Sequence, residues 1–255
     1  MKFAVISDIH ANATALRFVL DSIREQRVEK IYCLGDVVGF HTSPGECIDL
    51  LQHHRIECIA GNHDAGVVGS MKEEQFPREC WEAILWTRRN ISEGQLKFLQ
   101  ALQSQKVVDK KFWLMLGIFG DPYHYMTGGW THQYAFLRLQ LAGIRFAFYG
   151  HIHRQTCFKS PRRMVPREIS SVEAEGSVPL DGNSIYLINP GTIGQPRNNE
   201  SDAKFALVDL GIGSIMFKRI PYDYSTVLRR TLEVFPSHAS MYRRFGTMPA
   251  TAPAK

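Results

Sequence analysis

Four short segments carry residue types that commonly bind metals: Asp8-Ile9-His10, Gly35-Asp36-Val37-Val38-Gly39, Gly61-Asn62-His63-Asp64 and Gly150-His151-Ile152-His153. Each segment follows an apolar run typical of a buried strand, at residues 3–6, 31–34, 56–60 and 144–149. Loops at one edge of a sheet can bring side chains that are distant in sequence to one point. The pattern therefore predicts an α/β protein with a metal site at a sheet edge.

Strand-like and helix-like patterns alternate over the first 60 residues. Asn12 can cap a helix that runs to about Gln26, because its side-chain oxygen can accept a backbone N–H of the first turn. Ser43 and Glu46 have the spacing of a capping box, and the helix that they begin should end near His54. Alternation of this kind favours parallel strand pairing and a layered α/β architecture.

The whole pattern predicts a single domain over residues 1–246. Two helices are expected within 77–103, the second with a reciprocal cap at Ser92. Further elements are expected as strands at 112–118, 144–149, 185–188, 205–209 and 215–220 and as a helix near 224–234. By composition, residues 160–181 are predicted to be an exposed insertion and residues 247–255 a disordered tail.

The composition predicts a cytoplasmic protein without membrane segments. The chain has 255 residues, of which 44% are hydrophobic, enough to bury one large core. Apolar runs fall short of the ~20 residues that a membrane span needs, and the first residues enter a strand without the pattern of a secretory leader. Five cysteines without a close pair favour a reducing compartment.

The formal net charge of +5 suits an anionic substrate but does not identify one. Basic residues gather around Arg162 and again around Arg243, and a solvated loop and a solvated helix face explain both groups. A nucleic-acid groove would normally show a longer basic stripe with aromatic residues interleaved. Nucleic acid is therefore an alternative partner that the sequence does not favour.

Taken in order, the four segments resemble the calcineurin-like metallophosphoesterase superfamily, and within it the small bacterial phosphodiesterase-type members. The similarity continues through Asn189-Pro190-Gly191 and Gly194-Gln195-Pro196-Arg197, so it covers roughly residues 2–220. Each segment alone is more typical of a structural turn, and only their ordered combination indicates catalysis. The resemblance implies a four-layer α-β-β-α sandwich with two packed mixed sheets flanked by helices.

The resemblance also implies a two-metal site. It assigns the first metal to Asp8, His10, Asp36 and His153, and the second to Asp36, Asn62 and His151. Asp36 is the natural bridge, because a carboxylate has two oxygens and the flanking glycines let the backbone come close. Carboxylate, imidazole and amide ligands together suit one or two divalent transition metals, such as manganese, iron, zinc or nickel.

The implied reaction is hydrolysis of a phosphodiester or phosphomonoester bond by a metal-activated hydroxide. His63 matches the catalytic histidine of the superfamily and would hydrogen-bond a phosphoryl oxygen or protonate the leaving group. Asp64 is the candidate partner that fixes the ring of His63. His41 and Arg197 are candidates for substrate contact, with a surface ion pair as the alternative for Arg197.

One expected histidine is missing. Relatives carry His-Gly-Ser-Pro before Asp-Pro and a tyrosine, and matching Asp121-Pro122 and Tyr125 places Leu116 at the position of that histidine. Sliding the match gives Phe119 instead, which is no ligand either. The loss predicts a weakened second metal site and leaves three outcomes open. Water completes the site, His124 or His132 takes the place of the missing ligand, or the site stays empty.

The favoured function is a metal-dependent phosphoesterase for a small phosphorylated substrate, with residues 118–142 and 159–183 expected to shape its pocket. The alternatives are a non-enzymatic binding or scaffold protein with a partial metal site and, third, a nuclease. A scaffold has no need for polar groups such as Asn62 and His63, which cost stability when they are buried without partners. A homo-oligomer is left open, because such proteins often pair through a surface sheet or helix.

Overall fold

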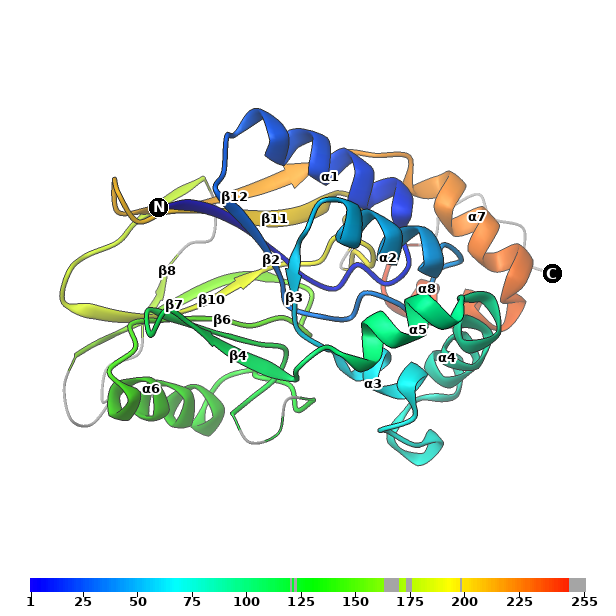
Figure 1. The fold of residues 1–255 in the computed structure, drawn as a ribbon, viewed down its shortest axis with the longest axis horizontal. Helices are drawn as coiled ribbons and strands as arrows, with labels where there is room; N and C mark the ends of the chain where they lie inside the picture. Colours follow the sequence, from blue (N-terminus) through cyan, green and yellow to red (C-terminus); the bar gives the residue numbers. More distant parts are fainter. Residues whose placement is uncertain (120, 122, 163–169, 173–175, 198, 248–255) are drawn as a thin grey trace.

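The computed structural model describes all residues except 120, 122, 163–169, 173–175, 198 and 248–255, so the predicted tail lies almost wholly outside the described residues. Two six-stranded sheets pack against each other (Figure 1). The first contains, in spatial order, β3 (Glu57–Cys58), β2 (Lys30–Cys33), β1 (Lys2–Ile6), β11 (Ala203–Asp209), β12 (Ser214–Ile220) and β9 (Ser177–Pro179). The second contains β4 (Gln105–Val108), β5 (Phe112–Met115), β6 (Phe146–Phe148), β10 (Ser184–Pro190), β7 (Gln155–Pro161) and β8 (Ser170–Val172).

Both sheets are mixed, as the sequence predicted. In the first sheet, β1 pairs in parallel with β2 and antiparallel with β11. In the second sheet, β10 pairs in parallel with β6 and antiparallel with β7. Helix α1 returns the chain from β1 to the start of β2, as a parallel pair requires, whereas the antiparallel pair of β11 and β12 needs only the turn at residues 210–213. The α/β sandwich with two packed mixed sheets is therefore confirmed.

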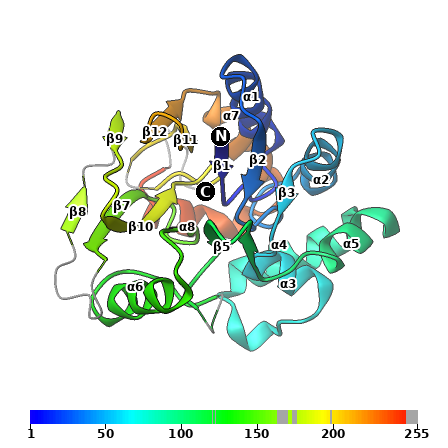
Figure 2. The same cartoon turned by 60° about the vertical axis from the view of Figure 1, so that its left-hand side comes forward.

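Eight α-helices lie in the described part of the chain: α1 (Ala13–Glu25), α2 (Pro44–His53), α3 (Asn62–Val68), α4 (Arg78–Asn90), α5 (Glu93–Gln100), α6 (Trp130–Ala142), α7 (Tyr224–Val234) and α8 (Ala239–Arg244). Helices α1 and α2 cover the outer face of the first sheet, and α6 covers the outer face of the second (Figures 1 and 2). The remaining helices gather beyond one end of the sheets, next to the loops that carry the predicted site (Figure 1). None of the described helices combines the length and apolar character that a membrane crossing requires.

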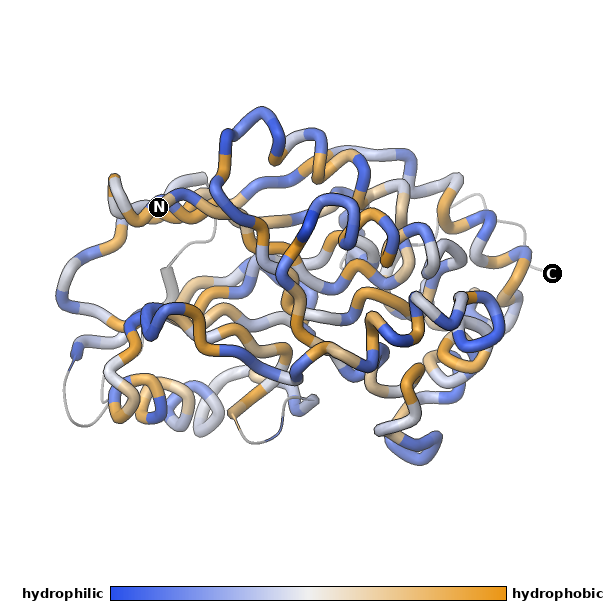
Figure 3. Tube along the Cα trace, viewed as in Figure 1, coloured by the Kyte–Doolittle hydropathy of each residue, from blue (hydrophilic) through white to orange (hydrophobic). Residues whose placement is uncertain are grey.

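The cores follow from the alternation of side chains along the strands. In β1, Ala4 and Ile6 pack beneath α1, while Phe3 and Val5 face the second sheet. Phe112 lies between the sheets with its ring stacked on that of Phe3, their centroids 4.9 Å apart. Hydrophobic residues accordingly run along the interior strands, and the outer turns of α1 are hydrophilic (Figure 3).

All three predicted helix starts are confirmed, and the predicted side-chain caps are confirmed at two of them. Asn12 caps α1 and Ser92 caps α5, because each side-chain oxygen accepts a backbone N–H of the first turn. The predicted capping box of α2 was wrong. Within the described residues Ser43 makes no such bond, and the Glu46 carboxylate instead accepts a hydrogen bond from Arg17 at 2.8 Å.

The described part of the predicted insertion at 160–181 forms edge strands. β8 pairs with β7, and β9 pairs with β12, so the segment passes from one sheet to the other. Sequence patterns did not reveal these strands, because each has only three residues and the segment is rich in turn-forming and charged residues. Whether this segment is an insertion relative to other proteins stays a prediction.

We predict that Phe112→Ala lowers the free energy of unfolding by about 3–5 kcal/mol, because it opens a cavity between the two sheets. Phe18→Ala is the matched control, since Phe18 is 50% exposed on α1 and its truncation should cost about 0.5 kcal/mol or less. Denaturant unfolding of both variants measures the difference. Equal losses would contradict the assignment of the main core to the space between the sheets.

Candidate metal centre

The predicted ligands lie on loops with an uncommon backbone conformation. Five of them have positive φ angles: Asp8 (53°), His10 (50°), Asp36 (50°), His151 (70°) and His153 (59°). Residues with side chains rarely adopt this left-handed region, and such strain persists only where the surrounding structure holds it. Strain that recurs at the ends of three strands marks these loops as a functional region.

The loops hold one another through backbone hydrogen bonds. The Asp8 N–H donates to the carbonyl of Gly35 at 3.1 Å, and the His10 N–H donates to that of Asp36 at 2.9 Å. The close approach of the next loop to Asp36 requires a glycine at position 61, because a Cβ there would lie 2.1 Å from Oδ1 of Asp36. The side chains that follow β1 and β2 are therefore fixed relative to each other before any ligand binds.

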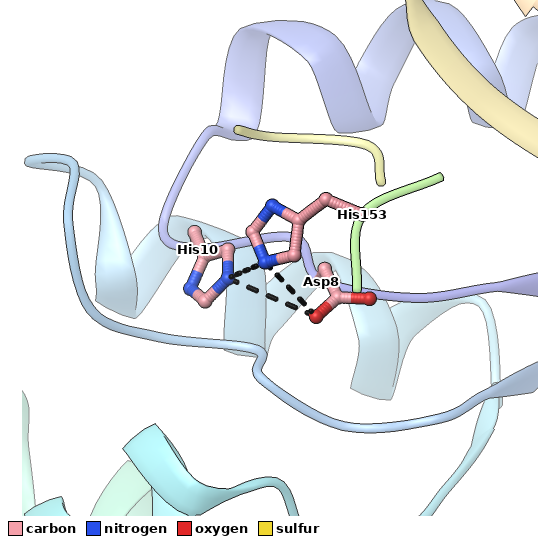
Figure 4. Close-up of side chains that lie close together, drawn as sticks. All are labelled: Asp8, His10 and His153. Atoms are coloured by element: carbon pink, nitrogen blue, oxygen red, sulfur yellow. Dashed lines mark hydrogen bonds and ion pairs between the residues drawn. The ribbon is translucent and has the colours of Figure 1, made fainter. Parts of the chain in front are cut away.

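Three of the predicted ligands, Asp8, His10 and His153, converge on one buried point, and Asp36 adjoins it through His10. Nε2 of His10 lies 3.2 Å from Nε2 of His153, which in turn lies 3.4 Å from Oδ1 of Asp8 (Figure 4). Oδ2 of Asp36 is 3.8 Å from the same nitrogen of His10. All four side chains are buried.

The protonation of this cluster suits a cation. Nδ1 of His153 lies 2.9 Å from the carbonyl oxygen of Gln195, and Nδ1 of His10 lies 3.4 Å from that of Val38. A carbonyl can only accept, so each Nδ1 carries the proton and each Nε2 presents a lone pair to the other. Burial lowers the pKa of both histidines well below the usual value and raises the pKa of Asp8 to about 7.

Three further predicted residues present buried polar atoms that have no hydrogen-bond partner in the described residues: Oδ1 of Asn62, Nδ1 of His63 and Nε2 of His151. Each unpaired atom of this kind costs about 1–3 kcal/mol. Asn62, His63 and His151 line one cavity of about 340 Å³ together with His10, Asp36 and His153. The second set of predicted ligands thus lies on the same cavity as the first.

Asp64 does not have the predicted arrangement. Its Oδ1 accepts the N–H of Val38 at 3.1 Å, and its Oδ2 accepts the N–H of Gly61 at 2.8 Å. As the third residue of α3, it turns its side chain back toward the start of the helix and away from the ring of His63. The prediction that Asp64 orients His63 was wrong, and the carboxylate instead holds the loop that carries Asp36.

His41 also differs from its prediction, because both ring nitrogens face protein groups. Nε2 lies 2.9 Å from the carbonyl oxygen of Gly194, and Nδ1 lies 2.8 Å from Oγ1 of Thr231 in α7. The ring is buried, and burial lowers its pKa to about 4. His41 therefore links the loops to α7, and the prediction of substrate contact was wrong.

Arg197, in contrast, reaches the cavity. Its Nη2 lies 3.4 Å from Nε2 of His153, and its guanidinium stacks over the ring of Phe245 with 4.7 Å to the centroid. The alternative of a surface ion pair does not describe this position. A planar cation here can meet an anion bound beside His153.

Sequence reasoning missed the apolar walls of the cavity. Phe40 and Phe76 pack against the ring of His63, and Met241 and Phe245 enter from the C-terminal part of the chain. Helix α8 has only six residues, and no clear hydrophobic periodicity in the sequence predicts it. For Tyr125 a signal existed, because the tyrosine in the matched motif stacks on His151, with ring centroids 3.8 Å apart.

The residues considered for the missing histidine lie in different surroundings. Leu116 is fully buried directly after β5, and its carbonyl accepts the N–H of Gly150 at 3.0 Å. His124 lies on the surface 4.0 Å from Asp121, and His132 packs on Phe158. Neither histidine lies at the metal-binding cluster.

Comparison with known proteins agrees with this geometry. The model of the calcineurin-like phosphoesterase superfamily domain matches residues 1–212. An uncharacterised protein of Methanocaldococcus jannaschii is 33% identical over 224 residues, which cover 86% of this chain and 87% of that protein.

Two solved structures share the fold. A metallophosphoesterase from Sphaerobacter thermophilus aligns with a TM-score of 0.77 and 24% identity, covering 97% of this chain and 99% of that one. A hypothetical protein from Pyrococcus horikoshii aligns with a TM-score of 0.75 and 17% identity, covering 98% and 99%. With motifs, domain match and fold in agreement, the chain belongs to the calcineurin-like phosphoesterase superfamily.

Proposed function

We propose that the protein is a metal-dependent phosphoesterase that hydrolyses an ester bond of a small phosphorylated substrate. The observation that carries this proposal is the buried cluster in which two imidazole lone pairs and two carboxylates face one another. Such a set of acceptors repels itself unless a cation or added protons lie among them, and a bound cation leaves the carboxylates charged. The narrower placement among small phosphodiesterase-type members and the cytoplasmic location stay predictions.

We assign the first metal to Asp8, His10, Asp36 and His153. Asp8, His10 and His153 form one compact group of donor atoms, and Asp36 forms a second with His10 and His63, so that His10 joins the two. The unpartnered atoms of Asn62 and His151 line the same cavity as Asp36, and these three residues would hold a second metal. Mixed nitrogen and oxygen donors suit manganese, iron, zinc or nickel. When bound, such metals lower the pKa of water and offset the charge that develops on the phosphoryl group.

The chain's own side chains would bind the phosphate and handle the proton. Arg197 can donate two parallel hydrogen bonds to phosphate oxygens from the edge of the cavity. Burial lowers the pKa of His63 to about 3, so the ring is neutral at pH 7 and can donate one N–H to the phosphoryl or the leaving oxygen. Gly39 makes room for this ring, because a Cβ there would lie 2.3 Å from Nδ1 of His63.

The apolar side chain of Leu116 supports the proposal that a second metal binds more weakly than the first. Its methyl group Cδ1 lies 2.9 Å from the position that a Cβ on Gly150 would take, and Oδ2 of Asp8 lies 3.0 Å from that same position. The apolar side chain therefore lies next to the loop of His151, at the position where the resemblance implies a histidine ligand. A scaffold protein with a partial metal site is the alternative that this substitution favours.

We predict that Asp36→Asn abolishes hydrolysis of 4-nitrophenyl phosphate and of bis(4-nitrophenyl) phosphate with added Mn²⁺. Metal affinity should fall by at least about 10–100-fold, because an amide lacks the charge of the bridging carboxylate. Asp21→Asn is the control, since Asp21 is an exposed carboxylate on α1. Absent turnover in the unmodified protein with Mn²⁺, Ni²⁺, Co²⁺ and Zn²⁺ would favour the scaffold alternative.

We further predict that Leu116→His raises the manganese content per chain or the rate of hydrolysis, because it restores an imidazole beside the second position. Leu116→Met keeps the volume without an imidazole and should leave both quantities unchanged. Elemental analysis after dialysis and the nitrophenyl assays measure the two effects. No change in either would show that Leu116 does not occupy the position of the missing ligand.

A further inference from the structure

A second cavity, of about 450 Å³, adjoins the first. Tyr125 and Arg197 line both cavities, and His132, Ile152 and Phe158 line only the second. Each cavity falls in the size range of pockets that hold small organic ligands.

The border between the two cavities stands directly beside the metal-binding cluster. The Tyr125 ring stacks on His151, and Nη2 of Arg197 lies 3.4 Å from Nε2 of His153. Ile152, between these two histidines in the sequence, lines the second cavity, whereas the histidines line the first. A phosphate held at the cluster and paired with Arg197 would therefore lie where the cavities meet.

His132 gives the second cavity a specific polar contact. Its side chain is only 5% exposed, and its Nε2 has no partner in the described part of the structure. The ring packs on Phe158 at 4.2 Å between centroids. Burial lowers the pKa of the ring, and a hydrogen bond to the backbone of Met126 opposes that shift only in part. That bond requires an N–H of the ring, which leaves Nε2 of the neutral ring as an acceptor.

We propose that the substrate is a phosphodiester with an organic group in each cavity, and that the group in the second cavity donates an O–H or N–H to Nε2 of His132. This inference rests on the proposed function and narrows it from esters in general to diesters. Hydrolysis then adds one water across one P–O ester bond and releases an alcohol and a phosphomonoester. A monoester would leave one of the two cavities unused.

Two variants and one control test the second cavity. His132→Phe removes the acceptor and keeps a ring against Phe158, while Thr127→Trp fills the cavity from an exposed position on its wall. His124→Phe makes the same chemical change at a half-exposed histidine that lines neither cavity. Unfolding midpoints equal to that of the unmodified protein show that the variants are folded.

Steady-state kinetics with Mn²⁺ should separate three probes: 4-nitrophenyl phosphate, bis(4-nitrophenyl) phosphate and the 4-nitrophenyl diester of thymidine 5′-phosphate. We expect His132→Phe to raise KM for the thymidine diester by roughly 3- to 10-fold, the equivalent of one hydrogen bond, with kcat unchanged. Thr127→Trp should raise KM for both diesters. KM for the monoester should stay constant in both variants, and His124→Phe should change none of the values.

Unchanged KM values for the diesters in both variants would overturn the proposal, as would an equal rise for the monoester. If the unmodified protein hydrolyses none of the probes, the proposed function is contradicted, but the proposal for the second cavity is not yet decided. Calorimetric titration with the thymidine diester then measures whether the second cavity binds this ligand. Weaker binding by His132→Phe and Thr127→Trp than by His124→Phe would still support a subsite. Equal or undetectable binding by all the proteins would overturn it.

Discussion

The site depends on five polar residues that are held in left-handed backbone conformations. Each of these conformations is unfavourable alone, at a cost of order 1–3 kcal/mol. They persist because the loops after β1 and β2 exchange backbone hydrogen bonds, and because the N–H of Gly194 donates to the carbonyl of Asp8 at 3.0 Å. The two packed sheets fix the strand ends, and the loops then have little freedom to move a ligand out of place. The donor atoms are thus arranged before a cation arrives.

The location of the site could be predicted from sequence because it depends on topology. Apolar runs with parallel pairing bring their ends to one edge, so Asp8 and Asp36 must lie close together whatever the details of their loops. The directions of individual side chains were not predictable in this way. Asp64 turns toward the start of its own helix, and His41 bonds to Thr231, which lies 190 residues further along the chain. Such contacts exist only after the chain has folded.

The electrostatics of the cluster are unusual for a buried region. Acidic and imidazole groups lie together there, and Nη2 of Arg197 lies 3.4 Å from Nε2 of His153. Desolvation therefore pushes the pKa of each carboxyl up and that of each imidazole down. Both shifts remove charge, because burial disfavours the charged form of any ionisable group. The position of Arg197 at the border of two cavities places its positive charge where an anion would join them.

The wall formed by Met241 and Phe245 has a consequence for how the protein can change. The match to the superfamily domain covers residues 1–212, yet Met241 of α8 and Phe245 directly after it line the cavity beside the buried cluster. Part of the cavity wall thus comes from a segment that lies beyond the residues matched by the superfamily domain. Substitutions near the C-terminus could alter which molecules enter while every ligand and the loops that hold them remain intact. Divergence of relatives in this last stretch would then change which molecules fit the cavity without changing the residues of the buried cluster.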